Sequence, residues 1–253
     1  MARKRGSKRR RRGRFSFLYK LLAVLATCAV VVTALTLFFR VETILVSGTV
    51  RYTEDDVRQA CGVEPGSNMY MLNKFEVQRQ LREALPYIED VRIRRVLPDK
   101  LVITVTECSH VYAVTQEDVA WVFSSSGRIV DRMESYEARY LPQVDGCQLL
   151  APALGTKIET DFEKDRDTRQ DSLLALLKAA EAANEVGRIS GYHLGDPERL
   201  SIDYAGRFEV RMPYEADYSY MLTYLGLVME QLGSNESGII DLTIPGEAHV
   251  ITD

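Results

Sequence analysis

The segment Ile88–Glu107 reads IEDVRIRRVLPDKLVITVTE, and its pattern decides the fold of the region around it. In the first half, apolar Val91 and Ile93 alternate with arginines, and the second half alternates in the same way from residue 101 onward. A period of two is typical of a strand with one buried and one exposed face. Leu-Pro-Asp-Lys at positions 97–100 separates the two halves and predicts a turn. The segment therefore predicts a β-hairpin.

Two short helices are predicted before this hairpin. Thr53 followed by Asp56 has the spacing of a helix N-terminus, and Asn73 followed by Glu76 has the same spacing. Gly62 is expected to end the first helix. The apolar face of the second helix is expected to contain Phe75, Val77, Leu81 and Leu85. With a β-prone run at residues 43–47, the order is β-α-α-β-β, which suits a small sheet with helices on one face.

The N-terminal region predicts a membrane anchor. Leu21–Phe39 contains 19 residues without a charged side chain, nearly enough for a helix to cross a bilayer core. Residues 1–20 contain ten of the 32 Lys and Arg residues and no acidic residue, so the positive-inside rule places the N-terminus in the cytoplasm. A cleaved signal peptide is the alternative, but it would have a shorter apolar stretch followed by a small-x-small site. We expect a tail at 1–16, a transmembrane helix at 17–39 and the first external module at 41–107.

A second module is expected from residue 108 to residue 251. Two helices with one apolar face are expected near residues 173–186 and 218–232. Strands are expected at 111–114, 120–123, 128–130, 189–192, 200–204, 208–212 and 239–244. The predicted fold class is therefore α+β, with a mixed sheet in this module.

These features resemble a known bacterial family. The carrying segments are Val46–Gly48, Cys61–Tyr70, Leu85–Ile88 and Arg94–Ile103, directly after a basic tail and one membrane helix. They resemble the POTRA domain of the cell-division proteins FtsQ and DivIB, and the Ile-Asp-Leu at 240–242 resembles the last strand of that family. The family usually has a lysine in its last helix, where this chain has Tyr220 and Met221.

The resemblance implies a non-enzymatic scaffold at the division septum, anchored as a single-pass type II protein. It implies binding to the membrane-proximal part of FtsB/DivIC, with FtsL in the same complex, and a role in controlling septal peptidoglycan synthesis. An exposed last strand can accept a partner strand through main-chain hydrogen bonds. Matched residue by residue, the partner-binding positions are Ile239, Ile240, Asp241, Leu242, Thr243, Ile244 and Gly246.

The sequence contains no recognisable catalytic, cofactor or metal motif. Its three histidines never fall at i, i+4 spacing, its external cysteines never form C-x-x-C, and nucleotide-binding glycine motifs are missing. We therefore expect no enzyme activity, no cofactor and no metal. Cys108 and Cys147 could form a disulfide, although free buried thiols are the simpler interpretation. Two alternatives stay open, a membrane-anchored POTRA assembly or transport factor and a cell-wall enzyme of unfamiliar type.

Overall fold

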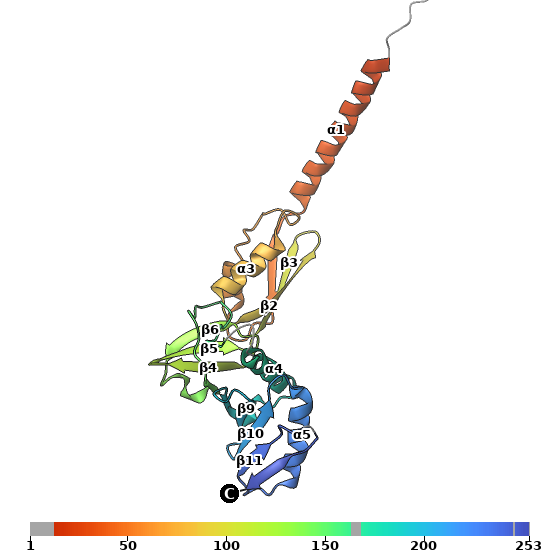
Figure 1. Ribbon diagram of the computed structural model, residues 1–253. Helices are drawn as coiled ribbons and strands as arrows, with labels where there is room; N and C mark the ends of the chain where they lie inside the picture. Colours follow the sequence, from red (N-terminus) through yellow and green to blue (C-terminus); the bar gives the residue numbers. More distant parts are fainter. Residues whose placement is uncertain (1–12, 163–167, 245, 253) are drawn as a thin grey trace, which may run out of the picture.

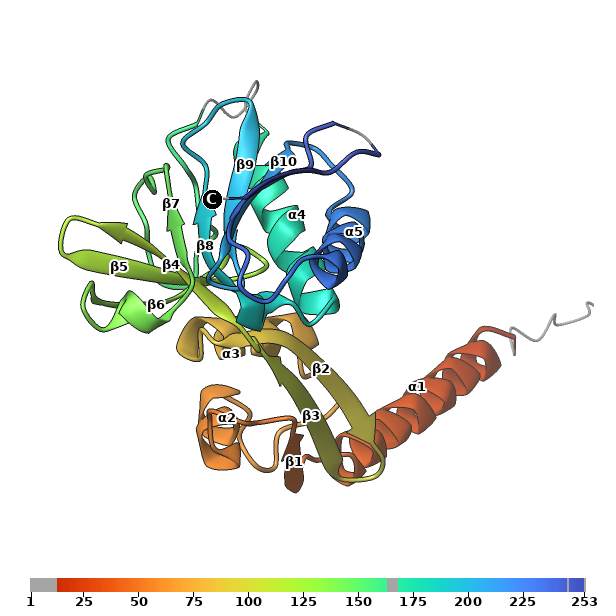
Figure 2. The same cartoon turned by 90° about the horizontal axis from the view of Figure 1, so that it is seen from below.

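The computed structural model describes residues 13–162, 168–244 and 246–252 (Figures 1 and 2). Helix α1 (Gly13–Phe38) projects away from the rest of the chain, and its window Phe17–Ala34 has a mean hydropathy of 2.1 with no residue buried. A helix that is apolar on all sides and exposed on all sides is suited to lipid rather than water. Among the described residues, α1 is therefore the one helix that is long and apolar enough to cross a membrane, as the sequence predicts.

A three-stranded sheet follows α1. Its elements are β1 (Thr43–Ser47), α2 (Glu54–Ala60), α3 (Lys74–Ala84), β2 (Ile88–Val96) and β3 (Lys100–Glu107). The strand order is β1-β3-β2, with β3 parallel to β1 and antiparallel to β2. The core of this unit includes Val57 of α2, Leu81 of α3 and Ile103 of β3. The β-α-α-β-β order and the predicted hairpin are confirmed.

Local capping explains where the helices begin. Thr53 accepts a hydrogen bond from the Asp56 backbone N–H, and the Asp56 carboxylate accepts one from the Thr53 N–H, so the predicted capping box is present. Asn73 caps α3 by accepting from the Phe75 N–H. Gly62, with φ +63°, follows the end of α2 as predicted.

The prediction that Phe75 lies in the core is wrong. Its side chain is 81% exposed, whereas Val77 and Leu81 are buried against the sheet. Residues four apart on a helix share a face, but Phe75 precedes Val77 by only two positions and lies on the other side of α3. Leu85, the fourth expected member, is the C-cap of α3 and is only half-buried.

The second unit is a nine-stranded mixed sheet with two helices. Its strands are β4 (Val111–Gln116), β5 (Val119–Ser124), β6 (Ile129–Glu134), β7 (Gln143–Asp145), β8 (Ile189–His193), β9 (Arg199–Tyr204), β10 (Phe208–Pro213), β11 (Gly238–Asp241) and β12 (His249–Thr252). Their order is β12-β11-β10-β9-β8-β7-β4-β5-β6. Helices α4 (Arg169–Ala182) and α5 (Tyr218–Gln231) lie side by side on one face, and short 3₁₀ turns occupy Ala138–Tyr140 and Val186–Arg188. The predicted α+β class is confirmed.

Two expectations for this unit differ from the structure. The first long helix ends at Ala182 rather than near residue 186, because Asn184 adopts a left-handed backbone conformation with φ +57°. Strands β7 and β12 were not expected, and β12 changes which strand forms the edge of the sheet.

A short segment and several hydrogen bonds connect the two units. Only three residues separate β3 from β4, and the Glu107 carboxylate at the end of β3 accepts hydrogen bonds from the backbone N–H groups of residues 50, 51 and 52. Across the joint, the Tyr87 hydroxyl donates to the Asp131 carboxylate at 2.8 Å. The Arg128 guanidinium donates to the Arg82 carbonyl at 2.6 Å. The large sheet is therefore held in a defined orientation relative to the small one.

His193 connects three neighbouring strands of the large sheet. Its Nδ1 lies 2.8 Å from Asp145 on β7, and its Nε2 lies 3.1 Å from Asp203 on β9. Burial by itself would lower the pKa of His193, but hydrogen bonds and charge attraction from the two carboxylates outweigh it and raise that pKa. The folded state therefore binds a proton here more tightly than the unfolded state does.

We predict that His193 makes folding pH-dependent. A raised folded-state pKa stabilises the protein fully below about pH 6.5, the usual unfolded value, and this contribution disappears as pH rises through the folded pKa. Thermal melts of the detergent-solubilised chain should show the parent losing stability on going from pH 5.5 to 8 relative to His193→Gln. Parallel pH profiles for the two proteins would contradict this. His249→Gln, at an exposed histidine beside Glu247, is the matched control.

Candidate partner-binding site

The strand predicted to form the free edge is not at the edge. β11 pairs with β10 in parallel on one side and with β12 in antiparallel on the other, with Ile239 opposite Ile251 and Asp241 opposite His249. β12 is therefore the terminal strand of the sheet within the described residues. The expectation that residues 239–244 present an unpaired strand edge is therefore wrong, because β11 is paired on both sides.

The chain reverses between β11 and β12, and the sequence contained a signal for this turn. Pro-Gly at 245–246 is typical of a turn. Gly246 has φ +80°, and the Glu247 N–H donates to the Ile244 carbonyl at 3.2 Å. Residue 245 itself lies outside the described residues. The four residues of β12, His-Val-Ile-Thr, are too few to give a clear alternating pattern.

The predicted partner-binding residues divide into three environments. Ile240 and Leu242 are buried in the core of the large sheet, so their side chains are not available to a partner. Ile239, Asp241 and Thr243 are half-buried. Ile244 and Gly246 are exposed, next to the turn that leads into β12.

Asp241 shapes the end of β11. Its Oδ1 accepts hydrogen bonds from the Thr243 N–H at 2.9 Å and from the Thr243 hydroxyl at 2.6 Å. Burial by itself would raise the pKa of Asp241, but these bonds, with Arg199 and Arg211 nearby, lower it overall. The carboxylate is thus ionised at neutral pH and fixes the chain as it leaves the sheet.

A groove of about 300 Å³ adjoins the exposed residues. It lies between the start of α5 and the turn after β11, and it is partly apolar. Tyr220 and Tyr224 of α5 stack in parallel with ring centroids 6.1 Å apart. The groove residues that bring the predicted segment and α5 together are Tyr220, Met221, Tyr224, Leu242, Ile244 and Gly246. Sequence reasoning treated Tyr220 and Met221 only as a departure from a family pattern, and the structure places them beside the predicted segment.

Gly238 allows β12 to approach β11. Its φ is +141°, and a Cβ atom at this position would lie 2.0 Å from the Ile251 carbonyl oxygen. Backbone atoms cannot move aside as a flexible side chain can. Any other residue at 238 must therefore displace β12 from the edge.

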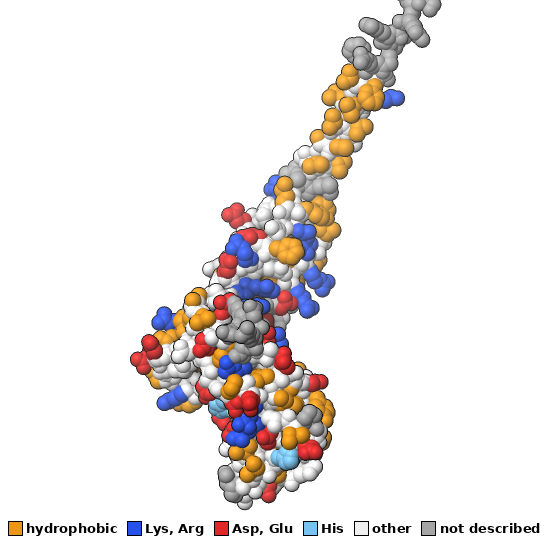
Figure 3. Space-filling model, in the orientation of Figure 1, with side chains coloured by type: hydrophobic (Ala, Val, Ile, Leu, Met, Phe, Trp, Pro, Cys, Tyr) orange, Lys and Arg blue, Asp and Glu red, His pale blue; other side chains and the backbone are white. Residues whose placement is uncertain are grey.

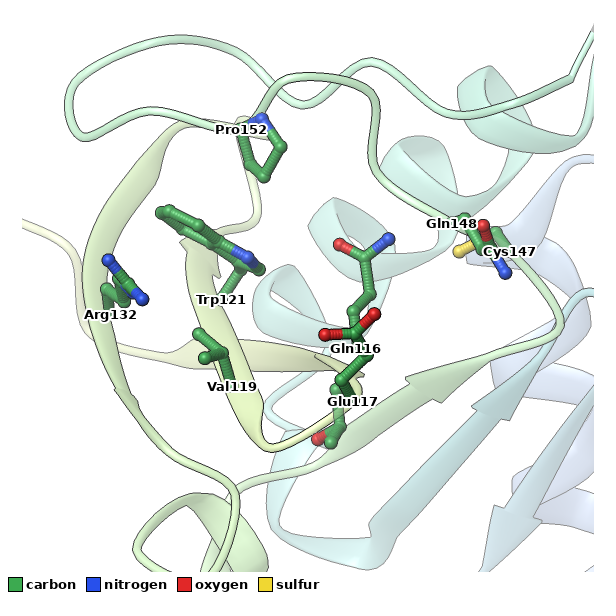
Figure 4. Close-up of a pocket in the computed structure, with 9 residues that line it drawn as sticks. Gln116, Glu117, Val119, Trp121, Arg132, Cys147, Gln148 and Pro152 are labelled. Carbon is green, nitrogen blue, oxygen red and sulfur yellow. The ribbon is translucent and has the colours of Figure 1, made fainter.

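A second pocket lies at the other end of the large sheet. A pocket of about 510 Å³ beside the β4–β5 hairpin contains Trp121, Arg132, Glu117 and Cys147 (Figure 4). The Arg132 guanidinium lies 5.4 Å from the Trp121 ring centroid. Burial, followed by the charges of Asp161 and Asp145, raises the pKa of Cys147 to about 12, so it is a protonated thiol at neutral pH. The pocket residues do not pair a nucleophile with a base.

The other side chains that could take part in catalysis make contacts that hold the fold together. Ser125 in the turn after β5 is buried, and its hydroxyl donates to Glu181 of α4 at 2.6 Å, whereas His110 lies 3.8 Å from the other Glu181 oxygen. A serine nucleophile needs an accessible hydroxyl and a base that a third group orients by a hydrogen bond, but here the serine is buried and the histidine is beyond hydrogen-bond distance of the carboxylate. Cys108 and Cys147 are free thiols. The described residues contain no cluster of three or more metal-ligating side chains.

Comparison with known proteins agrees with this architecture. The family model of the FtsQ-type POTRA domain matches residues 39–107, the small sheet and its two helices. The chain is 26% identical over 207 residues to the cell division protein FtsQ of Syntrophotalea carbinolica, covering 81% of this chain and 70% of that relative. Residues 39–107 are thus an FtsQ-type POTRA domain, and over most of its length the chain is similar to a cell division protein FtsQ.

Other FtsQ/DivIB relatives match over shorter regions. DivIB of Clostridium botulinum strain Hall is 22% identical over 127 residues, which is 50% of this chain and 49% of that protein. FtsQ of Streptomyces bingchenggensis is 36% identical over 70 residues, covering 28% of this chain and 26% of that protein. The chain thus spans about 70% of the first relative and about half or less of the other two.

We predict that Gly238→Ala detaches β12. The clash with the Ile251 carbonyl should lower the free energy of unfolding by about 1–3 kcal/mol. Hydrogen exchange at residues 249–252 should become faster than in the parent chain. The matched control is Gly206→Ala, a positive-φ glycine with no atom within 4 Å of the added Cβ, which tests backbone strain without the clash. Unchanged protection of β12 would show that this strand does not depend on Gly238.

Proposed function

We propose that this protein is a non-enzymatic scaffold of the bacterial division machinery that accepts a partner strand at the edge of its large sheet. The observation that supports this most directly is the short edge strand β12, with its outer side unpaired among the described residues and an aromatic groove beside the turn that leads into it. Alternate residues of an edge strand direct their N–H and C=O groups away from the sheet. These groups can bind an extended segment of a partner by β-augmentation.

The predicted residues keep a role in this proposal. Ile239–Asp241 support β12 from inside the sheet, while Ile244 and Gly246 form the turn beside the groove. Main-chain bonding by β12 would provide affinity, and the groove at Tyr220 and Tyr224 would select side chains that flank the partner strand. The proposed site is thus one strand further out than the sequence predicted, and residues of α5 form part of it.

The partners we propose are FtsB/DivIC and FtsL, single-pass proteins of the same membrane. Relatives of this chain are named cell division proteins, which supports a division role. In this proposal residues 1–16 are a cytoplasmic tail, 17–39 cross the membrane, and 41–107 and 108–251 are the external POTRA and β domains. The complex would help to control septal peptidoglycan synthesis, and this chain would act through binding alone.

Proline substitution in β12 tests whether this strand is the docking edge. Successive residues of a strand direct their N–H groups to opposite sides, so one of Val250 and Ile251 points toward β11 and the other outward. Proline at the outward position should leave folding intact, because that N–H is not in the ladder. It should weaken binding of a DivIC-type external fragment at least about tenfold, equivalent to about 1.4 kcal/mol. The measurement is biolayer interferometry with Val250→Pro and Ile251→Pro chains in nanodiscs.

The two proline variants control for each other. The inward variant should lose stability as well as binding, whereas the outward variant should lose binding alone. If the variant that keeps its thermal stability also keeps its full affinity, β12 is not the docking edge.

Localisation in dividing cells tests the division role. A fluorescent protein fused to the N-terminus should give a band at the division site, and Gly238→Ala should weaken the band while the label stays in the membrane. Gly206→Ala is the control in the same fusion. A uniform membrane signal from the parent chain would contradict a division role and favour an unrelated assembly factor.

A further inference from the structure

Large apolar side chains are exposed on the small sheet unit at the foot of α1. Met71 is 82% exposed and Phe75 is 81% exposed, and Tyr70 next to them is also exposed. They occupy the connection between α2 and α3 and the first turn of α3. Three large apolar residues within six positions form more than the scattered exposure usual on a soluble surface. The exposed Phe75 is also the residue that its sequence pattern assigned to the core.

Backbone hydrogen bonds fix the height of this loop relative to the membrane anchor. α1 ends at Phe38, and the next residue accepts a hydrogen bond at its carbonyl from the Met69 N–H at 3.0 Å. The Val41 N–H then donates to the Ser67 carbonyl at 2.9 Å, and Arg40 forms a β-bridge with Asn68. Bridged strands lie about 5 Å apart. The loop that carries Tyr70 and Met71 therefore lies at the level where the chain leaves α1.

Aromatic contacts continue from the anchor into this loop. The Phe39 ring packs edge-on against Phe38 on one side and against Tyr70 on the other, with centroid distances of 5.3 and 5.2 Å. Arg95 donates to the Leu72 carbonyl at 2.9 Å, and its guanidinium lies 5.9 Å from the Tyr70 ring centroid. Amphipathic aromatic rings beside an arginine are typical of the membrane–water interface.

The turn between β2 and β3 reaches the same level. The backbone N–H groups of Glu42 and Thr43 both donate to the Asp99 carbonyl, at 2.9 and 3.2 Å. This turn carries exposed Val96 and Leu97. Figure 3 shows hydrophobic and basic side chains together on the part of the molecule next to the foot of α1. Two separate loops thus present apolar side chains at the end of the unit where the anchor enters.

Charge at this end is mixed. Arg40, Arg94 and Lys100 are exposed, but Glu42 and Glu64 are exposed there as well. Attraction to anionic head groups can therefore contribute, but the apolar side chains must supply most of the interaction. The occupant that fits is the bilayer interface, because it is continuous with α1, whereas a protein partner would have to enter between this loop and the membrane.

We propose that Tyr70, Met71 and Phe75, with Val96 and Leu97, insert into the outer interface of the bilayer. The POTRA domain then rests on the lipid surface instead of moving freely at the end of its anchor. This inference does not depend on the proposed partners or on the β12 edge. It requires only that α1 spans the membrane.

The test uses the full chain in nanodiscs whose lipids carry brominated acyl chains, which quench nearby indole fluorescence. Trp121, the single tryptophan, gives the background. Phe75→Trp should be quenched at least about twofold more than this background, since interfacial side chains reach about 5–10 Å into the headgroup boundary. The matched control is Leu227→Trp, at a residue 53% exposed on α5, far from α1 in Figure 1. Equal quenching of the two introduced indoles, in phosphatidylcholine and in phosphatidylcholine with phosphatidylglycerol, would overturn the proposal.

A second variant pair separates insertion from mere proximity. In a Met71→Trp chain, adding Phe75→Asp should reduce quenching toward the Leu227→Trp level, because a carboxylate is expelled from the interface. Adding Leu227→Asp to the same Met71→Trp chain should leave quenching unchanged. If Phe75→Asp has no effect although the protein stays folded, the loop lies near the membrane without inserting, and the proposal fails. Excess quenching in phosphatidylcholine alone supports apolar insertion, and excess only with phosphatidylglycerol supports insertion assisted by the basic residues.

Discussion

The backbone hydrogen bonds at Phe39 and Val41 orient the small sheet unit, and with it the rest of the chain, relative to α1. A transmembrane helix followed by a flexible linker would leave the external part free to tumble. Here the chain enters the small sheet unit within three residues of the end of α1, and both sides of that segment are occupied, by residues 66–69 on one side and by the β2–β3 turn on the other. The direction of the POTRA domain is therefore set by the anchor itself.

The second joint carries this orientation to the large sheet. The Glu107 carboxylate accepts hydrogen bonds from three consecutive backbone N–H groups in the loop after β1. Because the acceptor is charged, these bonds are stronger than neutral hydrogen bonds. The Tyr87–Asp131 hydrogen bond and a small apolar cluster that includes Tyr87, Val122 and Val130 close the other side. Removing one member of a part-buried network of this kind leaves its partners without hydrogen bonds. We therefore expect the two units to move as one rigid body and not independently of each other.

Local sequence patterns predicted most of the fold but little of the candidate site. The hairpin at 88–107 and the capping box at Thr53 depend on neighbouring residues, so their patterns identify them. β7 and β12 contain three and four residues, respectively, which is too short for an alternation to be recognised. Phe75 was predicted to be buried because it is an apolar residue in a helix. Its angular position around the helix axis instead places it on the exposed side of α3.

The candidate site depends on tertiary contacts that no local pattern contains. Tyr220 and Tyr224 meet Ile244 only after α5 has packed on the sheet and the chain has turned back toward β12. The tight approach of Gly238 to Ile251 is likewise a contact between two strands. The sequence placed the candidate site at residues 239–246, and it missed β12, the strand that pairs with β11 there.

The position of β12 constrains any partner in the same membrane. Strand β11 lies at the end of the molecule opposite α1, with the small sheet unit between it and α1 (Figure 1). A strand that pairs with β12 must be presented at that distance, so it cannot directly follow the partner's own transmembrane helix. A helix rises only 1.5 Å per residue, so a helical spacer would need many residues to cover such a span. In the proposed complex, the height of the partner strand above the membrane would therefore be set by the partner's own spacer and by the POTRA domain that lies between α1 and the large sheet.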